Sequence, residues 1–276
     1  MLSAALFFLL QVGPNPSTGS MPGLPPEILD WRAMEKQREG ANVTLVNRLG
    51  NCLARAEEDT AAALAEAGDW LTKANGIEQA QALHCRGYSE ARLTRWRDAA
   101  TSFQAARNAV GEMDVKYRAR LGTIAGSALI TAGDYNGALE MLDLAAADAA
   151  IAEFTALGGE IQIDRARALL SLEQSGEAAA ALTNARRLSP LSARAWLLSA
   201  TLARRSDDLG NAAEYIAQAG RLDAANPEVL LEAGVIAVMS GDNDLAREKW
   251  GWIVSGYPDA AQRATAESYL RQLDQQ

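Results

Sequence analysis

Residues 120–145 read RLGTIAGSALITAGDYNGALEMLDLA, and this stretch decides the fold. Two alanine-rich segments flank the triplet Gly133-Asp134-Tyr135, which contains a turn-forming glycine. Glycine, aspartate and asparagine between two such segments favour a turn, whereas alanine and leucine favour helix because their side chains lose little entropy there. The stretch therefore predicts a helix, a tight turn and a second helix.

The same pattern recurs along the chain at a regular spacing. Ala178, Ala212 and Ala246 follow one another at intervals of 34 residues, and each lies in a similar alanine-rich segment. Small residues recur at one phase and bulky residues at another, with prolines at two predicted helix ends. The small residues are Gly87, Gly126, Ala166, Ala200 and Gly234; the bulky ones are Phe103, Leu142, Leu182, Ile216 and Trp250; the prolines are Pro190 and Pro258. A fixed period in this range indicates a solenoid of stacked helix pairs.

The pattern resembles the tetratricopeptide repeat family, and the resemblance covers about residues 80–258. It implies an all-α, right-handed superhelical solenoid of antiparallel helix pairs, with about five to six repeats and a C-terminal capping helix. The predicted units are about 80–111, 119–158, 159–192, 193–226 and 227–258, with a weak unit at 43–79 and a capping helix at 259–274 that begins at Asp259. Longer spacings between the earlier units predict a second helix extended through Ala147 to Leu157 and ended by Gly158 and Gly159.

The first 20 residues have the pattern of a signal peptide. An apolar run from Ala4 to Leu10 is too short to span a bilayer, but it has the length of a signal-peptide core. No Lys or Arg precedes this run, so an uncleaved anchor, a mistaken start codon and a loose strap stay open as alternatives. A Pro- and Gly-rich linker at residues 21–30 follows, and the solenoid is predicted to occupy 31–276.

Two cysteines, Cys52 and Cys85, are 33 residues apart, which is close to one repeat. First helices of neighbouring units lie side by side, so these side chains are candidates for a disulfide if the protein is exported. The alternative is two small buried thiols. Export would place the protein in the periplasm or cell envelope, and retention would make it a cytoplasmic regulatory or assembly factor.

The sequence offers no basis for catalysis, a metal site or a cofactor. His84 is the only histidine, no HExxH or CxxC spacing is present, and no GxxxxGK[ST] loop could cradle phosphates. A net charge of −9 disfavours nucleic acid as a partner. The class that remains is a non-catalytic scaffold that binds protein or peptide, with no small-molecule substrate and with membrane contact at most through the N-terminal segment. A substrate-recruiting domain of an enzyme is the less favoured alternative.

The resemblance also implies where a partner would bind. In tetratricopeptide repeats, the second, fifth and ninth positions of each first helix line the concave groove. Carried onto this chain, these positions and one nearby arginine give the predicted groove residues Gln81, His84, Tyr88, Arg120, Thr123, Ser127, Arg167, Arg194, Thr201, Arg204, Leu231 and Val235, together with Glu160, Ile163, Leu197 and Glu228. Arginines among them would pair with carboxylates of the partner, and the last unit would hold an apolar side chain. The alternative for each position is a solvated helix face or a core residue.

Overall fold

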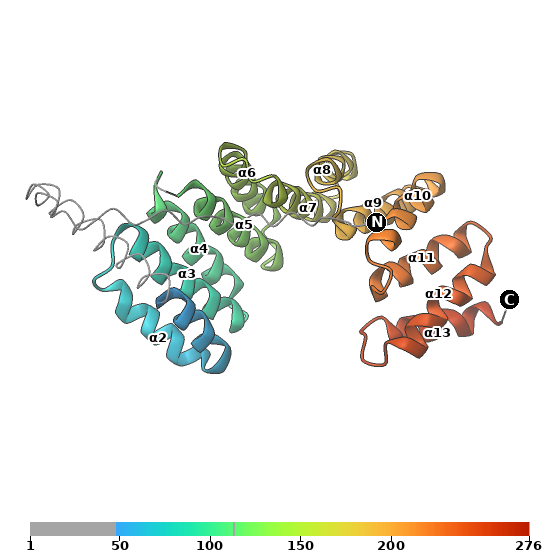
Figure 1. Cartoon of the computed structure of the whole chain (residues 1–276), viewed down its shortest axis with the longest axis horizontal. Coiled ribbons are helices and arrows are strands. Elements are labelled where there is room, and N and C mark those ends of the chain that lie inside the picture. The colour runs from blue at the N-terminus through green and yellow to red at the C-terminus, as the bar shows by residue number, and fades with distance from the viewer. Residues whose placement is uncertain (1–47, 113, 276) are drawn as a thin grey trace, which may run out of the picture. The chain divides into compact units, whose positions relative to one another are not determined.

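The computed structural model describes residues 48–112 and 114–275, and every regular element among them is a helix (Figure 1). Helical residues 48–58 come first, followed by α2 (Thr60–Leu71), α3 (Gly76–Arg92), α4 (Trp96–Val110), α5 (Val115–Thr131), α6 (Tyr135–Ile151), α7 (Thr155–Ser171), α8 (Ser175–Leu188), α9 (Ala193–Arg205), α10 (Leu209–Leu222), α11 (Pro227–Met239), α12 (Asn243–Gly256) and α13 (Arg263–Leu273). The predicted signal peptide, linker and start of the weak unit lie outside the described residues.

The helices pack as consecutive pairs. α3 packs on α4, α5 on α6, α7 on α8, α9 on α10 and α11 on α12, while α13 packs on α12. We call α3, α5, α7, α9 and α11 the first helices, and their partners the second helices. α5 contacts α7, α7 contacts α9, and α9 contacts α11, so the first helices of successive pairs adjoin one another. The predicted all-α solenoid of helix pairs is confirmed.

Small residues on the first helices allow close approach of the second helices, as the sequence predicted. A Cβ atom built on Gly87 would lie 2.8 Å from the Phe103 ring, and one on Gly126 would lie 2.6 Å from the Leu142 side chain. Both bulky partners are buried, so each pair is closed by a large side chain that occupies the space a Cβ would need.

Alanine takes the glycine's place in two pairs. Ala166 belongs to the same core cluster as Leu182, and Ala200 to the same cluster as Ile216. These alanines are 1% and 0% exposed, so their methyl groups fit within the packed interface. The α7–α8 and α9–α10 pairs thus accept alanine at this position, whereas the bulky partners of Gly87 and Gly126 leave no room for a Cβ atom.

The turn between the two helices of each pair has the same backbone conformation throughout. Thr94, Gly133, Glu173, Asp207 and Gly241 all have positive φ, between 58° and 85°. Each lies five residues before the recurring buried alanine of its second helix. Glycine adopts this left-handed conformation without steric cost, whereas the threonine, glutamate and aspartate at the equivalent positions do not.

The extra residues of the earlier repeats lie partly in a longer second helix, as predicted, and partly in longer first helices: α6 contains 17 residues, whereas α8, α10 and α12 contain 14. α6 ends at Ile151, and Gly158 and Gly159 lie inside α7, so the expectation that they end a second helix is wrong. First helices α5 and α7 each contain 17 residues, whereas α9 and α11 contain 13. A Cβ on Gly159 would lie 2.2 Å from Ser189 Oγ, so this glycine serves close packing and not helix termination.

The capping helix begins later than predicted. Asp259 lies in a turn, and α13 begins at Arg263 after Gln262. α13 buries Ala266 and Leu273 in a cluster with Trp250 and Ile253 of α12. The last helix pair is therefore covered on its C-terminal side by apolar side chains of α13.

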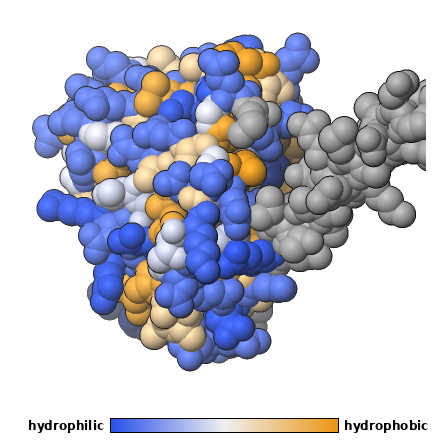
Figure 2. All heavy atoms as spheres, turned by 90° about the vertical axis from the view of Figure 1, so that its left-hand side faces the viewer, coloured by the Kyte–Doolittle hydropathy of each residue, from blue (hydrophilic) through white to orange (hydrophobic). Residues whose placement is uncertain are grey.

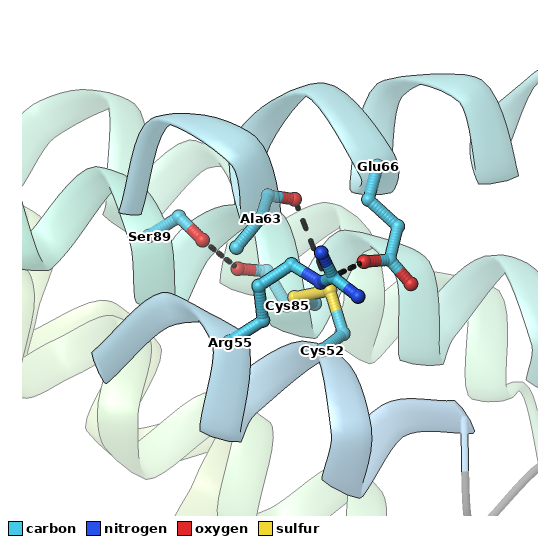
Figure 3. The surroundings of a disulfide bond; sticks show 6 residues. All are labelled: Cys52, Arg55, Ala63, Glu66, Cys85 and Ser89. Carbon is cyan, nitrogen blue, oxygen red and sulfur yellow. Dashed lines mark hydrogen bonds and ion pairs between the residues drawn. A yellow bond between two sulfur atoms is a disulfide. The ribbon is translucent and has the colours of Figure 1, made fainter. Parts of the chain in front are cut away.

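A disulfide joins Cys52, in helical residues 48–58, to Cys85 in α3, with the two Cα atoms 6.1 Å apart (Figure 3). Both cysteines are fully buried, and Cys52 Sγ lies 3.8 Å from the carbonyl oxygen of Ala63. An ion pair between Arg55 and Glu66 lies beside the disulfide. The covalent bond thus fixes the first described helix against the first complete pair.

Candidate functional site

The candidate site is the face formed by the first helices, where the predicted groove residues are located. These residues come from α3, α5, α7, α9 and α11, and three consecutive contacts between these helices bring α5, α7, α9 and α11 together. The side chains at corresponding positions therefore lie on neighbouring elements, although they are far apart in sequence. We call this surface the first-helix face.

Several predicted groove residues are not exposed on this face. Gln81 and Thr123 are each only 7% exposed, and the Thr123 hydroxyl donates to the carbonyl oxygen of Ala119 in its own helix. Ile163 and Leu197 are buried in core clusters. These four positions are therefore corrected from groove to core, the alternative that the sequence left open for each, because neighbouring side chains remove them from the surface.

His84 is half-buried and contacts the next repeat. Its Nδ1 lies 2.9 Å from the hydroxyl of Tyr117 in α5, and its ring meets Phe103 edge-on at 5.9 Å. Burial lowers the pKa of His84 to about 4, because the charged imidazolium is disfavoured away from water. The imidazole is therefore neutral near neutral pH, and it links α3 to α5 through a hydrogen bond.

Other predicted groove residues also bridge neighbouring first helices. The Tyr88 hydroxyl donates to Glu57 of residues 48–58, and the Ser127 hydroxyl donates to Asp164 of α7. Arg204 of α9 donates to both carboxylate oxygens of Glu232 in α11, at 2.6 and 3.3 Å. With His84–Tyr117, these inter-repeat polar contacts join successive first helices along most of the chain.

The arginines of the first-helix face differ in how far they are neutralised. Arg167 and Arg194 share one carboxylate, Asp164, at 3.0 and 3.7 Å. Arg120 is exposed and lies over the Phe154 ring at 5.1 Å, and no carboxylate of the described residues lies within ion-pair distance of it. Arg204 is already paired with Glu232 of α11, and its pairing with a partner's carboxylate stays a prediction.

The C-terminal end of the face is apolar. Leu231 and Val235 of α11 are half-buried and pack against the last core cluster. A cavity of about 270 Å³ opens between α11 and α13 and is lined by Val235, Val238, Met239, Trp250, Tyr269, Gln272 and Leu273. Met239 is 44% exposed at its rim. An apolar side chain of a partner would lose its contact with water there.

The remaining predicted residues lie around this face without a structural partner that defines a role. Thr201 is half-buried on α9, and Glu160 and Glu228 are exposed near the starts of α7 and α11. Glu228 lies in the first turn of α11, where a carboxylate is favoured by the helix dipole. Nothing in their geometry indicates chemistry.

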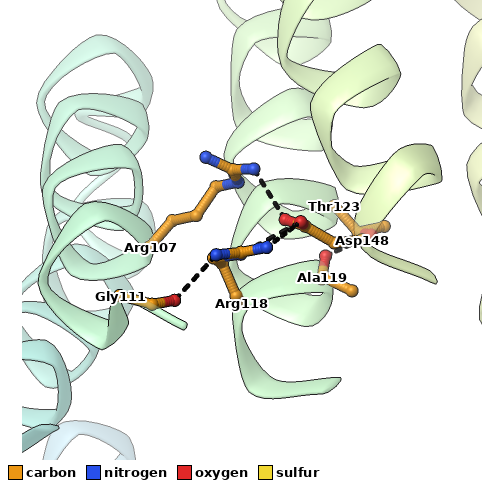
Figure 4. A network of polar contacts seen from close by, with 6 residues as sticks. All are labelled: Arg107, Gly111, Arg118, Ala119, Thr123 and Asp148. Carbon is orange, nitrogen blue, oxygen red and sulfur yellow. Dashed lines mark hydrogen bonds and ion pairs between the residues drawn. The ribbon is translucent and has the colours of Figure 1, made fainter. Parts of the chain in front are cut away.

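Buried acidic residues are what the sequence reasoning missed. Asp148 of α6 binds Arg107 of α4 at 2.6 Å and Arg118 of α5 at 2.6 Å, and Arg118 also donates to the Gly111 carbonyl at 2.8 Å (Figure 4). This carboxylate raises the pKa of Arg118 through its hydrogen bond. The sequence does contain a signal for this contact: Asp148 lies beside the apolar stripe of Leu142, Ala145 and Ala149. A carboxylate can be buried at such a position only if a positive charge pairs with it.

No arrangement for catalysis or metal binding emerges from residues 48–112 and 114–275. Within them, no group of three or more His, Cys, Asp or Glu side chains could hold a metal ion. None of the helices in this part of the chain is long and apolar enough to cross a membrane. What the first-helix face offers is a row of polar and basic side chains that ends in an apolar cavity.

The order and packing of these helix pairs are those of a tetratricopeptide-type helical-repeat fold. No family model matches the sequence, and no curated protein matches it. The chain is similar to the solved structure of Pseudomonas aeruginosa PilF, at 16% identity, with a TM-score of 0.65 over 83% of this chain and 99% of that one. It is also similar to PilW, described as a widely conserved type IV pilus biogenesis factor, at 17% identity and a TM-score of 0.64 over 80% and 97% of the two chains.

A third similar structure is BtubC from P. vanneervenii, at 13% identity, with a TM-score of 0.59 over 81% of this chain and 92% of that one. At these identities the likeness concerns the fold. The order and packing of helix pairs are what this chain shares with these structures.

Proposed function

We propose that this protein is a non-catalytic scaffold that binds a segment of another protein along its first-helix face. The observation that carries the proposal is the cavity between α11 and α13, which opens beside Val235 at the end of the contacting first helices. A solenoid presents its first helices as one extended surface, and an apolar recess at its end supplies an anchor for a bound segment.

The charges on this face favour a partner segment with acidic residues. Arg167 and Arg194 share the single negative charge of Asp164, and Arg120 is exposed beside them in the series. Three arginines against the one carboxylate of Asp164 give this stretch of the face a local excess of positive charge, although Glu160 and Glu228 are exposed near the starts of α7 and α11 and the whole chain has a net charge of −9. A partner with a carboxylate toward its middle and an apolar side chain near the α13 end would complement this arrangement.

The proposed site is tested by photo-crosslinking in the native host. A photoreactive amino acid replaces Val235 in one variant and Arg120 in a second, and the control variant carries it at Leu191, which is 81% exposed in the turn before α9. Val235 and Arg120 should both crosslink to one polypeptide that Leu191 does not capture. Identical products from all three positions would exclude a specific first-helix site.

We also infer that the protein works in the periplasm or cell envelope. The buried disulfide between Cys52 and Cys85 supports an oxidising compartment, because cytosolic thiols are kept reduced. The alternative is a cytoplasmic regulatory or assembly factor with two reduced thiols. Membrane contact through the N-terminal segment and its cleavage as a signal peptide belong to the same proposal.

Intact mass of the protein isolated from its host, with thiols alkylated before and after reduction, separates these locations. Loss of about 20 N-terminal residues, with alkylation only after reduction, is expected for export. A full-length chain that takes up two alkyl groups without reduction would contradict both the export signal and the disulfide.

A further inference from the structure

A second recess lies away from the first-helix face, between the second helices α8 and α10 and over α9. It has a volume of about 260 Å³, and its apolar part includes Leu182 and Leu202. Its polar part includes Thr183, Arg186 and Asn211. The recess therefore presents apolar contact and hydrogen-bond donors to the same small space.

The Arg186 guanidinium is held in a fixed position in this recess. Its Cζ atom lies 4.3 Å from the ring centre of Tyr215 and 5.2 Å from that of Trp196. One terminal nitrogen donates to the Ser199 hydroxyl and the other to the Thr183 hydroxyl at 3.3 Å. Aromatic rings and hydroxyl groups thus orient the guanidinium without neutralising its charge.

Arg186 differs from the other half-buried arginines in residues 48–112 and 114–275. Each of those has a carboxylate partner: Arg48 with Glu78, Arg107 and Arg118 with Asp148, Arg165 with Asp143, Arg167 with Asp164, Arg204 with Glu232, and Arg263 with Glu267. No carboxylate of the described residues lies within 4.0 Å of the Arg186 guanidinium. Two of its five N–H groups are needed for the two hydroxyl contacts, so donors remain for a ligand.

The charge of the recess selects the kind of anion. Asp208 also lines it, and hydrogen bonds from Asn211 lower the pKa of Asp208, so this carboxylate is ionised near neutral pH. One arginine and one aspartate leave the recess without net charge, so an anion is held by direct contact with the guanidinium, and the second negative charge of a dianion such as phosphate would stay unpaired. A singly charged carboxylate in a bidentate contact with the arginine fork fits better.

We propose that this recess binds a carboxylate attached to a short aliphatic group, with the carboxylate on Arg186 and the aliphatic group against Ala179, Leu202 and Ala203. Such a ligand could be a free small acid or the C-terminal residue of a polypeptide. The site is separate from the first-helix face, and the proposal does not depend on the function proposed above.

Calorimetric titration with N-acetyl-leucine and its uncharged amide tests the site in the full chain. The acid is expected to bind with a dissociation constant on the order of 1 mM, as suits so small a ligand, and the amide at least about tenfold more weakly. No binding of the acid at several times that concentration, or equal binding of acid and amide, would overturn the proposal.

Substitutions locate the binding. Arg186→Gln should weaken binding of the acid by about tenfold or more, and Arg186→Lys should weaken it less, because lysine keeps the charge but loses the planar fork. Arg187→Gln is the matched control, since this neighbouring arginine is exposed and does not line the recess. Thermal unfolding of each variant verifies that the fold is retained. If Arg187→Gln lowered the affinity as much as Arg186→Gln, the site would be disproved.

A short peptide that ends in leucine distinguishes the two sources of ligand. Binding about tenfold tighter than N-acetyl-leucine, and lost when the peptide is amidated, would assign the recess to the C-terminus of a polypeptide. Equal affinity of the peptide acid and N-acetyl-leucine would assign it to small free acids. Both results require that Arg186→Gln abolishes the difference between acid and amide.

Discussion

The first three helix pairs (α3 to α8, the earlier pairs) and the last two (α9 to α12, the later pairs) pack in the same way. They differ in where ion pairs and surface recesses lie. In the earlier pairs, Asp148 and Asp164 each bind two arginines, and the disulfide ties α3 to residues 48–58. In the later pairs, one ion pair, Arg204–Glu232, bridges the first helices. The later pairs also contain an apolar recess of about 480 Å³ that exposes 52% of Trp252.

The contact of a small residue with a bulky one inside each pair therefore determines the backbone arrangement, whereas the side chains on the surfaces between repeats can differ from one repeat to the next. Figure 2, which looks at the left-hand side of Figure 1, shows mostly hydrophilic residues, with apolar residues in small separate patches. Where neighbouring helices are joined by charged groups, little apolar surface is left for a partner. The recess of about 510 Å³ in the earlier region is lined by charged side chains such as Arg86, Glu90 and Asp98, whereas the recess of the later pairs is lined mainly by apolar ones. An apolar recess is the kind of surface on which a partner binds.

Among these substitutions, the largest loss of stability is expected at Asp148, in the earlier pairs. Asp148→Ala leaves the half-buried Arg107 without its carboxylate and Arg118 with only the Gly111 carbonyl, and removal of one member of such a group costs up to about 3–5 kcal/mol in the free energy of unfolding. Glu232→Ala in the later pairs should cost less, because it frees only Arg204. Urea unfolding measures both, and equal losses would erase the distinction between the two regions.

His84 makes the earlier region sensitive to acid. Its pKa is about 4 in the fold and 6.5 in the unfolded chain, so between these values the unfolded chain binds a proton that the fold does not. Stability therefore falls as the pH falls from 6.5 to 4, by roughly 3 kcal/mol from this group. The slope of unfolding free energy against pH should flatten in His84→Gln. An unchanged slope would mean that His84 is accessible to protons in the fold.

In the later pairs, too, the small residue of a first helix should tolerate no added side-chain atom. A Cβ on Gly234 would lie 2.2 Å from the Trp250 indole nitrogen, so Gly234→Ala should destabilise the fold by about 1–3 kcal/mol. Gly251→Ala is the control in α12, where no atom lies within 4 Å of the added Cβ. Alanine should stabilise that helix by about 0.5–1 kcal/mol. Thermal unfolding that shifts both variants in the same direction would contradict the close approach.

The smallest effects are expected in the turns. Glu173→Gly should stabilise the α7–α8 turn by up to about 1 kcal/mol, because glycine adopts its φ of 61° without strain. Gly133→Ala, at the equivalent turn, should destabilise by a similar amount. These opposite signs, measured by urea unfolding, would show that one backbone conformation serves both. A loss of stability in Glu173→Gly would break that equivalence.

The sequence by itself determined the helix pairs, their small-to-large contacts and the phase of the first helices. These follow from sterics that recur with the repeat: a small residue such as Gly126 is needed wherever a bulky one such as Leu142 approaches, so the pattern is visible in the letters. The predicted positions of the first helices also indicated that His84, Ser127 and Arg194 lie on first helices.

Only the tertiary structure decided which of those side chains face one another and which remain open. Asp164 joins Ser127 to Arg194, residues that lie 37 positions before it and 30 positions after it, and such contacts depend on side-chain direction and burial, which spacing does not specify. The prediction that Gly159 ends a helix is wrong for the same reason, because the Ser189 side chain that packs against this glycine belongs to the residue that follows α8. Periodicity is a local property of the chain, whereas pairing of charges is a property of the packed surfaces.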